Sequence, residues 1–295
     1  MRLPDWVRAQ APAAGVLELK KFLRKSGIHT VCEEARCPNK GACFSRTAAA
    51  FLIMGPVCTR NCGFCSVQSV SDIDGSEPQG LVPLSADEPE RLAAAAAAMG
   101  LRYVVITSVT RDDLDDGGAG HFAGCIRAVK SAIPGVKVEV LTPDFGGSRQ
   151  ALDTVLSAGP DVFNHNVETV PGLYPAVRPQ ADYKRSLSVL EWASRASQAS
   201  QASGIPVKSG FMLGLGERPE EVEAVMRDLR ASGCRMLTIG QYLRPSRRSL
   251  PVSEYIRPER FGELKTAALA MGFKSVASGP LVRSSMNAEE YYRDV

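Results

Sequence analysis

Short β-rich runs alternate with longer helical stretches between residues 48 and 242, and this alternation restricts the fold more than any other feature of the chain. Strands separated by helices form right-handed βαβ crossovers, and these crossovers produce a parallel sheet. Six consecutive units favour an α/β fold built as a partial (β/α)6 TIM-type barrel, with a doubly wound sheet as the competing topology. The predicted strands are Ala49–Met54, Tyr103–Ser108, Lys137–Leu141, Val162–Asn166, Val207–Met212 and Met236–Gly240. The predicted helices cover residues 86–99, 119–132, 148–158, 182–203 and 218–232.

The two ends of the chain fall outside this repeat. Residues 1–47 form a predicted N-terminal extension, residues 48–242 the barrel, and residues 243–295 a C-terminal extension with a helix at 258–271 and a strand at 274–278. Parallel α/β proteins place their sites at the carboxyl ends of the strands. We therefore expect both extensions to pack over the barrel mouth.

Composition excludes several classes of function. The formal charge of +3, from 35 basic and 32 acidic residues, is too small to indicate a nucleic-acid partner. The longest apolar stretches, Ala48–Gly55 and Leu92–Met99, are far shorter than the roughly 18 residues that cross a bilayer. The N-terminus lacks the apolar core of a signal peptide, so we expect a cytoplasmic protein without membrane contact. In that reducing compartment metal binding explains eight cysteines better than disulfides do.

Three of these cysteines, Cys58, Cys62 and Cys65, follow the first predicted strand with C-x3-C-x2-C spacing. Iron–sulfur clusters are normally held by four thiolates, so three ligands leave one iron open for chemistry. A zinc site is the alternative, but zinc normally takes four ligands in paired C-x2-C spacings. The spacing therefore favours a cluster.

A second triplet, Cys32, Cys37 and Cys43, has C-x4-C-x5-C spacing in the N-terminal extension. It too supplies three thiolates. Two clusters that each have an open iron indicate catalysis better than they indicate passive electron transfer. The two remaining cysteines, Cys125 and Cys234, lie in or after predicted helices and are expected to be buried core residues.

The C-x3-C-x2-C loop resembles the signature of the radical S-adenosylmethionine (radical SAM) enzymes. The run Gly210-Phe-Met-Leu-Gly-Leu-Gly-Glu217 resembles the glycine-containing motif that those enzymes carry on the fifth strand. The resemblance implies a [4Fe–4S] cluster on Cys58, Cys62 and Cys65, with S-adenosylmethionine chelating the fourth iron through its amino and carboxylate groups. It also implies that S-adenosylmethionine binds near Gly210, Met212, Gly214 and Glu217.

Two further residues are candidate contacts of S-adenosylmethionine. Glu168 follows the fourth strand and could bind the ribose hydroxyls or the methionine amine, or instead pack against the next helix. Arg178 could bind the methionine carboxylate through a two-pronged hydrogen bond, with a surface position before Pro179 as the alternative. The aspartates at 112, 113, 115 and 116 resemble a metal loop, but a solvated turn is the preferred interpretation.

The segment from Glu33 to Asn39 resembles the N-terminal signature of the lipoyl synthases, and the segment from Gly279 to Ser285 resembles their C-terminal motif. This resemblance implies a second, auxiliary [4Fe–4S] cluster on Cys32, Cys37 and Cys43, completed by the oxygen of Ser284. The alternative for Ser284 is a cap on the short helix that Asn287 opens. Two positions depart from the family pattern: Met286 replaces a usual tyrosine and Ser249 a frequent histidine.

The reaction implied by the lipoyl synthase resemblance is the insertion of two sulfur atoms, at carbons 6 and 8, into an octanoyl chain on a lysine of a lipoyl carrier protein. The auxiliary cluster would donate the sulfur. The expected partners are a carrier such as the glycine cleavage H protein or a 2-oxoacid dehydrogenase lipoyl domain, a ferredoxin or flavodoxin reductant, and an iron–sulfur carrier that restores the auxiliary cluster. A monomer is expected. The alternatives are a biotin synthase-like or methylthiolating radical enzyme, and a zinc-stabilised binding module.

Overall fold

The computed structural model describes residues 3–8, 16–44, 48–72, 81–199, 204–293 and 295. The chain forms two compact units, which are described separately below. The N-unit comprises Gln10–Asn61 and Cys65–Asp161. The C-unit comprises Met1–Ala9, Cys62–Phe64 and Val162–Val295.

The N-unit is built on a sheet whose strands run in the order β1 (His29–Thr30), β2 (Ala50–Ile53), β5 (Tyr103–Ser108) and β6 (Lys137–Leu141). Strands β2, β5 and β6 are parallel, and β1 pairs with β2 in the antiparallel sense. All four residues of β2 are buried, as expected for a continuous apolar run in a parallel sheet. A separate parallel pair, β3 (Val57–Cys58) and β4 (Gln68–Ser69), flanks the second cysteine triplet in sequence.

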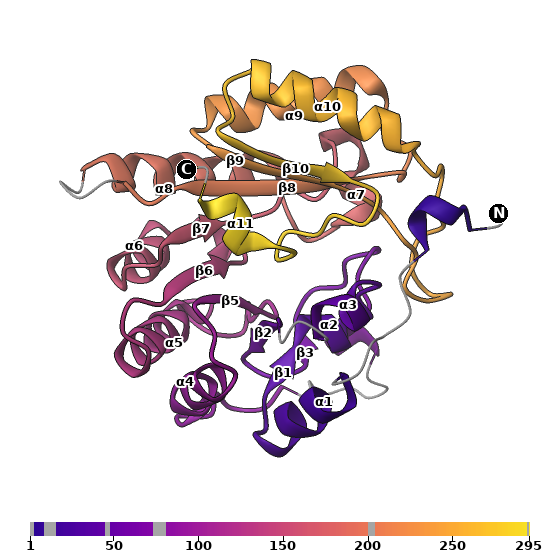
Figure 1. Ribbon diagram of the computed structural model, residues 1–295. Helices are drawn as coiled ribbons and strands as arrows, with labels where there is room; N and C mark the ends of the chain where they lie inside the picture. The colour runs from indigo at the N-terminus through magenta and orange to yellow at the C-terminus, as the bar shows by residue number, and fades with distance from the viewer. Residues whose placement is uncertain (1–2, 9–15, 45–47, 73–80, 200–203, 294) are drawn as a thin grey trace. The chain divides into compact units, whose positions relative to one another are not determined.

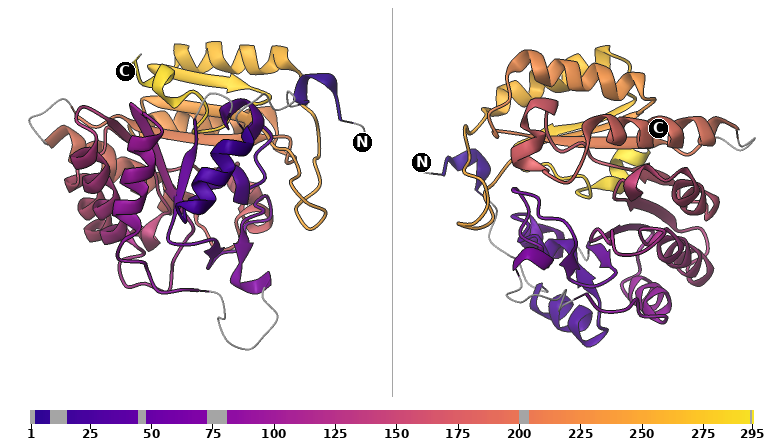
Figure 2. Two further views of the ribbon diagram at one scale, coloured as in Figure 1. Left: turned by 60° about the horizontal axis from the view of Figure 1, so that its bottom comes forward. Right: turned by 180° about the vertical axis from the view of Figure 1, so that it is seen from behind.

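Helices α4 (Glu88–Ala98), α5 (Ala119–Ala132) and α6 (Arg149–Ser157) follow one another along one side of the N-unit (Figures 1 and 2). Helix α6 begins at the cap Ser148, whose hydroxyl accepts from the Ala151 amide at 3.2 Å. The remaining helical segments of this unit are α1 (Val16–Lys25), α2 (Val31–Glu34), α3 (Lys40–Phe44), and the 3-10 turns η2 (Val70–Asp72) and η3 (Phe145–Gly147).

The C-unit contains four parallel strands in the order β7 (Val162–Asn164), β8 (Val207–Leu213), β9 (Met236–Gln241) and β10 (Ser275–Gly279). Helices α9 (Pro219–Ala231) and α10 (Pro258–Ala270) cover one face of β8 to β10 (Figure 1). The other helical segments of this unit are η1 (Asp5–Val7), η4 (Pro171–Leu173), α7 (Tyr174–Val177), α8 (Tyr183–Ala199) and α11 (Ala288–Tyr292).

All six predicted strands are confirmed, with ends that differ by two residues at most. The predicted helix at 182–203 begins at Tyr183 and is helical to Ala199, and its residues 200–203 lie outside the described residues. The alternation of parallel strands and helices confirms the α/β fold class and is consistent with a partial TIM-type barrel. The division into a barrel and two covering extensions stays a prediction.

One face of the C-unit sheet, here called the polar face, carries Lys208, Gly210 and Thr238 beside the apolar Met212. Alternate residues of a strand share a face, so Lys208, Gly210 and Met212 lie together on β8. The neighbouring strand places Thr238 opposite Gly210.

Within the described part of the chain no helix is long and apolar enough to cross a bilayer.

Candidate active site

The N-terminal cysteine triplet is carried by two short helices of the N-unit and by the segment between them, which contains Cys37. Cys32 lies in α2, which Thr30 caps by accepting from the Glu33 amide at 3.3 Å, and Cys43 lies in α3. Burial, together with the charges of the Cys37 and Cys43 thiolates, raises the pKa of the Cys32 thiol to about 12, although a backbone hydrogen bond at Ala50 opposes the shift. Metal ligands of this kind must lose their protons, so a cluster bound here would release a proton from Cys32.

The second triplet begins at Cys58, the last residue of β3. The Cys58 sulfur accepts hydrogen bonds from the backbone N–H groups of Thr110 at 3.2 Å and Arg60 at 3.4 Å. The Cys65 sulfur accepts from the Val67 amide at 3.4 Å. Hydrogen bonds of this type stabilise the thiolate form that iron requires, and such bonds tune the potential of a cluster. The donors around these sulfurs therefore fit a cluster.

All eight cysteines are free thiols. Across the described ranges, no three His, Cys, Asp or Glu side chains converge on one point as ligands of a single metal ion. Ligands of a cubane bind different irons, so they stand farther apart than the ligands of one ion. Cys125 and Cys234 are fully buried, which confirms that they are core residues.

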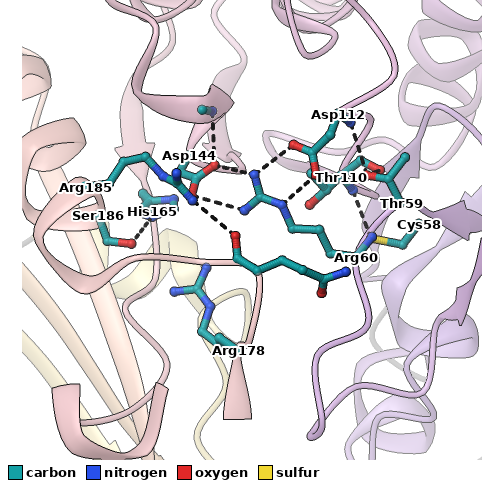
Figure 3. Close-up of polar contacts among 12 residues, drawn as sticks. Cys58, Thr59, Arg60, Thr110, Asp112, Asp144, His165, Arg178, Arg185 and Ser186 are labelled. Carbon is teal, nitrogen blue, oxygen red and sulfur yellow. Dashed lines mark hydrogen bonds and ion pairs between the residues drawn. The ribbon is translucent and has the colours of Figure 1, made fainter. Parts of the chain in front are cut away.

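Arg60 lies between Cys58 and Cys62 in sequence and is held by two carboxylates. Figure 3 shows its guanidinium between Asp112 and Asp144. The nearest contacts are 2.7 Å from Nε to Asp112 and 2.7 Å from Nη2 to Asp144. Asp112, Asp113, Asp115 and Asp116 are exposed and lie in turns, which confirms the predicted solvated turn, and Asp112 is in addition ion-paired with Arg60.

In the C-unit, the Ser284 hydroxyl lies against the polar face of the sheet. It accepts from Asn166 Nδ2 at 2.9 Å and lies 3.2 Å from Thr238 Oγ1. Lys208 Nζ donates to the Ser284 carbonyl oxygen at 2.6 Å. The helix-cap alternative for Ser284 is wrong, because Asn287 occupies the N-cap position of α11.

The glycine motif occupies the end of β8 and the loop after it. A Cβ at Gly210 would collide with Thr238 Oγ1 and lie 3.1 Å from Asn166 Oδ1, so glycine is required by close packing. Gly214 has a φ of +95°, a conformation that side chains rarely adopt. The Glu217 carboxylate accepts from the amides of Gly214 at 2.5 Å and Leu215 at 2.9 Å. Glu217 therefore fixes the loop by binding its backbone, and Met212 stays a predicted ligand contact.

Glu168 and Arg178 lie near one another after β7. Glu168 is in the left-handed region, with φ +65°, and its amide donates to the Gly210 carbonyl at 3.0 Å. Burial raises the pKa of Glu168, while Arg178, a hydrogen bond with Asn166 and the charge of Arg283 oppose the shift.

The side chain of Arg178, labelled in Figure 3, is buried, so the surface alternative is wrong. Its Nη1 donates to the Asn166 carbonyl at 3.0 Å. The guanidinium carbon lies 5.4 Å from the ring centre of Tyr174. Binding of S-adenosylmethionine by Glu168 and Arg178 stays a prediction.

Comparison with known proteins decides the family. Residues 52–229 match the Radical SAM superfamily. The lipoyl synthase of Rubrobacter xylanophilus is 53% identical over 292 residues, which cover 99% of this chain and 87% of that protein. The lipoyl synthase of Syntrophotalea carbinolica is 54% identical over 294 residues, which cover 99% of this chain and 91% of that protein. This chain belongs to the lipoyl synthase family.

Solved structures agree with the fold of a radical SAM enzyme. The FeFe-hydrogenase maturase HydG from Carboxydothermus hydrogenoformans has a TM-score of 0.59 and 18% identity, covering 76% of this chain and 52% of that one. At this identity the likeness concerns the fold alone.

Four polar residues of these sites were not predicted as functional: Arg60, Asn166, Lys208 and Thr238. For Lys208 a signal existed, since a lysine in an otherwise apolar buried strand needs a partner. The other three carry no local signal, because only the fold brings them to their partners.

Proposed function

We propose that this protein inserts two sulfur atoms into an octanoyl chain bound to a lysine of a lipoyl carrier protein. The identity of more than 50% with lipoyl synthases over nearly the whole chain carries this conclusion. The radical SAM match and the two triplets of free cysteines support it.

The residues that would hold the cofactors are the two cysteine triplets. Cys58, Cys62 and Cys65 would bind the radical SAM cluster, and Cys32, Cys37 and Cys43 the auxiliary cluster. The first cluster, with S-adenosylmethionine, would supply a hydrogen-abstracting radical, and the auxiliary cluster would supply the sulfur. By family resemblance, Ser284 would hold the auxiliary cluster through a hard oxygen, which binds iron less firmly than a soft thiolate.

The chain's own residues contribute positioning and charge stabilisation. The amides of Thr110 and Arg60 stabilise the Cys58 thiolate. Glu217 orders the loop after β8. With Gly210, Met212, Gly214, Glu168 and Arg178, this loop is our proposed binding region for S-adenosylmethionine. Holding the reacting groups in place is the main contribution such a site can make.

The cellular partners belong to the same proposal. The carrier is the glycine cleavage H protein or a 2-oxoacid dehydrogenase lipoyl domain, the reductant a ferredoxin or flavodoxin, and an iron–sulfur carrier rebuilds the auxiliary cluster. We place a monomeric enzyme in the cytoplasm. These assignments rest on the family resemblance.

The deciding experiment is anaerobic incubation of the reconstituted protein with an octanoyl-lysine peptide, S-adenosylmethionine and a strong reductant. We expect about eight irons per chain, four for each cluster. The product should gain two sulfurs and lose two hydrogens by mass spectrometry. Zinc with no change in the peptide would instead indicate a binding module.

A single variant can distinguish the roles of the two cysteine triplets. Replacing Cys32, Cys37 and Cys43 with alanine should abolish sulfur insertion and leave S-adenosylmethionine cleavage intact. Cys125→Ala is the matched control. It also removes a thiol, but Cys125 is a buried core residue and belongs to neither triplet. Thiolated product from the triple variant would contradict the sulfur-donor role.

A further inference from the structure

Arg60 is a buried cation in the spacer between two proposed cluster ligands. Its side chain is 8% exposed, and it makes four hydrogen bonds of 2.7–3.0 Å to two carboxylates. Asp144 is 0% exposed, whereas Asp112 is 44% exposed. Both pairs are two-pronged, the geometry that a planar guanidinium provides and an ammonium does not.

The two carboxylates come from the ends of neighbouring parallel strands. Asp112 lies in the loop after β5, and Asp144 lies in the loop after β6. Asp144 is itself held, since it caps η3 by accepting from the Gly146 amide at 3.1 Å. The guanidinium therefore ties the cysteine loop to two strand ends whose own positions are fixed by the sheet.

A second set of contacts carries this restraint to the Cys58 sulfur. The Thr59 amide donates to the Thr110 carbonyl at 2.9 Å, and the Thr59 hydroxyl accepts from the Asp112 amide at 3.1 Å. The Thr110 amide in turn donates to Cys58 Sγ at 3.2 Å. Residues 58–60 and 110–112 thus form one hydrogen-bonded block that includes two N–H groups directed at the sulfur (Figure 3).

We propose that Arg60, clamped by Asp112 and Asp144, is a positioning residue that holds the Thr110 and Arg60 amides on Cys58 Sγ and thereby sets the reduction potential of the bound cluster. This rests on the proposed function, in which Cys58 is a cluster ligand. Reduction adds negative charge to a cluster, and hydrogen bonds to its sulfurs stabilise that charge. Loosening the clamp lengthens these bonds and makes the potential more negative.

The same contacts also contribute to stability, so the test must separate the two roles. Removing one partner of a buried ion pair leaves an uncompensated charge and destabilises the fold. A loss of activity alone would not distinguish positioning from unfolding. The reduction potential does distinguish them, because it is measured only on protein that has folded and bound iron.

The experiment uses a background in which Cys32, Cys37 and Cys43 are alanine, so that a single cluster is observed. Into it are placed Arg60→Gln, Arg60→Lys and the control Arg111→Gln. Arg111 is also a buried arginine. Its backbone belongs to the block of residues 58–60 and 110–112, but its side chain bonds elsewhere, to the Asp113 carboxylate and to the carbonyl oxygens of Met54 and Val82. Each protein is loaded anaerobically and titrated by electron paramagnetic resonance, and S-adenosylmethionine cleavage is measured at a fixed potential.

We expect Arg60→Gln to shift the potential to a more negative value and to slow cleavage about tenfold, the effect of losing one such bond. Arg60→Lys should recover part of the shift, since it keeps the charge and loses the two-pronged geometry. Arg111→Gln should lower the thermal stability and leave the potential unchanged. Should Arg60→Gln not fold, Asp112→Asn keeps the buried pair with Asp144 and should give a smaller shift of the same sign.

The inference would be overturned if Arg60→Gln had the wild-type potential and spectrum. If Arg60→Gln does not fold, the same result in Asp112→Asn would overturn it. Either result leaves the proposed function intact. An equal shift in Arg111→Gln would also overturn the inference. Failure of the background protein itself to bind about four irons would overturn the proposed function, and the inference with it.

Discussion

Lys208 Nζ donates to the backbone carbonyl of Ser284 at 2.6 Å, across 76 residues of sequence. Lys208 is 1% exposed and is the second residue of β8. A buried ammonium is costly unless it is paired, so this contact holds the C-terminal segment firmly on the strand. The Ser284 hydroxyl is thereby kept within reach of Asn166 and Thr238.

Replacing Lys208 with methionine should loosen the Ser284 segment. We expect sulfur insertion to fall about tenfold or more, as for the loss of one hydrogen bond to a charged group, and S-adenosylmethionine cleavage to fall less. Both products are quantified from the same reaction by mass spectrometry. Lys265→Met, on the exposed side of α10, is the control. Equal losses in both products would argue against a specific effect on Ser284.

Replacing Gly210 with alanine should displace the Thr238 and Asn166 side chains that contact Ser284. The expected cost is about 1–3 kcal/mol in the free energy of unfolding, as for other overpacked sites. Gly262→Ala on α10 is the matched control, because its Cβ meets nothing within 4 Å. A glycine inside a helix costs about 0.5–1 kcal/mol, so this control should be stabilising. Denaturant unfolding of the cluster-free protein measures both values.

Replacing Glu217 with glutamine should release one of the two amides that its carboxylate binds. We expect the Gly214 and Leu215 amides to exchange faster with deuterium, and S-adenosylmethionine to bind about tenfold more weakly. Glu220→Gln, at an exposed position on α9, is the control. Unchanged exchange at Gly214 would contradict the role of Glu217 in ordering the loop.

The raised pKa of Glu168 predicts a dependence of stability on pH. The folded protein holds this proton more tightly than the unfolded chain, so stability is highest below the unfolded pKa of about 4.3 and falls as the pH rises through the folded value. Glu168→Gln removes that loss. We therefore expect the variant to gain thermal stability over the wild type between pH 5 and pH 8.

Thermal unfolding of the cluster-free protein across this range measures the difference. Glu259→Gln on α10 controls for the loss of an exposed charge. A constant difference between variant and wild type at every pH would show that the Glu168 carboxyl does not titrate abnormally. Weaker binding of S-adenosylmethionine by the same variant would support the predicted contact.

The sequence predicted the regular part of the fold because alternating strands and helices leave a periodic pattern. Strands β5 and β6 agree with their predicted bounds at both ends, since both are short runs rich in β-branched residues between helical stretches. The short elements around the first triplet, α2 and α3, were not predicted. Helices of four or five residues have too few turns to show a period.

The spacing of the cysteines is visible in the sequence and predicts their role, whereas the sequence gives no sign of the residues that contact them. Asp112 and Asp144 lie 52 and 84 residues after Arg60 in the sequence. Their pairing depends on adjacent strand ends, which a single sequence does not reveal. For the same reason the contact of Ser284 with Asn166 could not be inferred from the C-terminal motif.

The contacts of Thr59 and Arg60 explain the spacing between Cys58 and Cys62. Of the three residues between Cys58 and Cys62, Thr59 is fastened to residues 110–112 and Arg60 to both aspartates. Removing or adding one residue there would force the chain to give up one of these attachments. The contacts of the scaffold thus restrict the gap length independently of the proposed cluster, and we expect a single-residue insertion after Cys58 to be as damaging as losing a thiol.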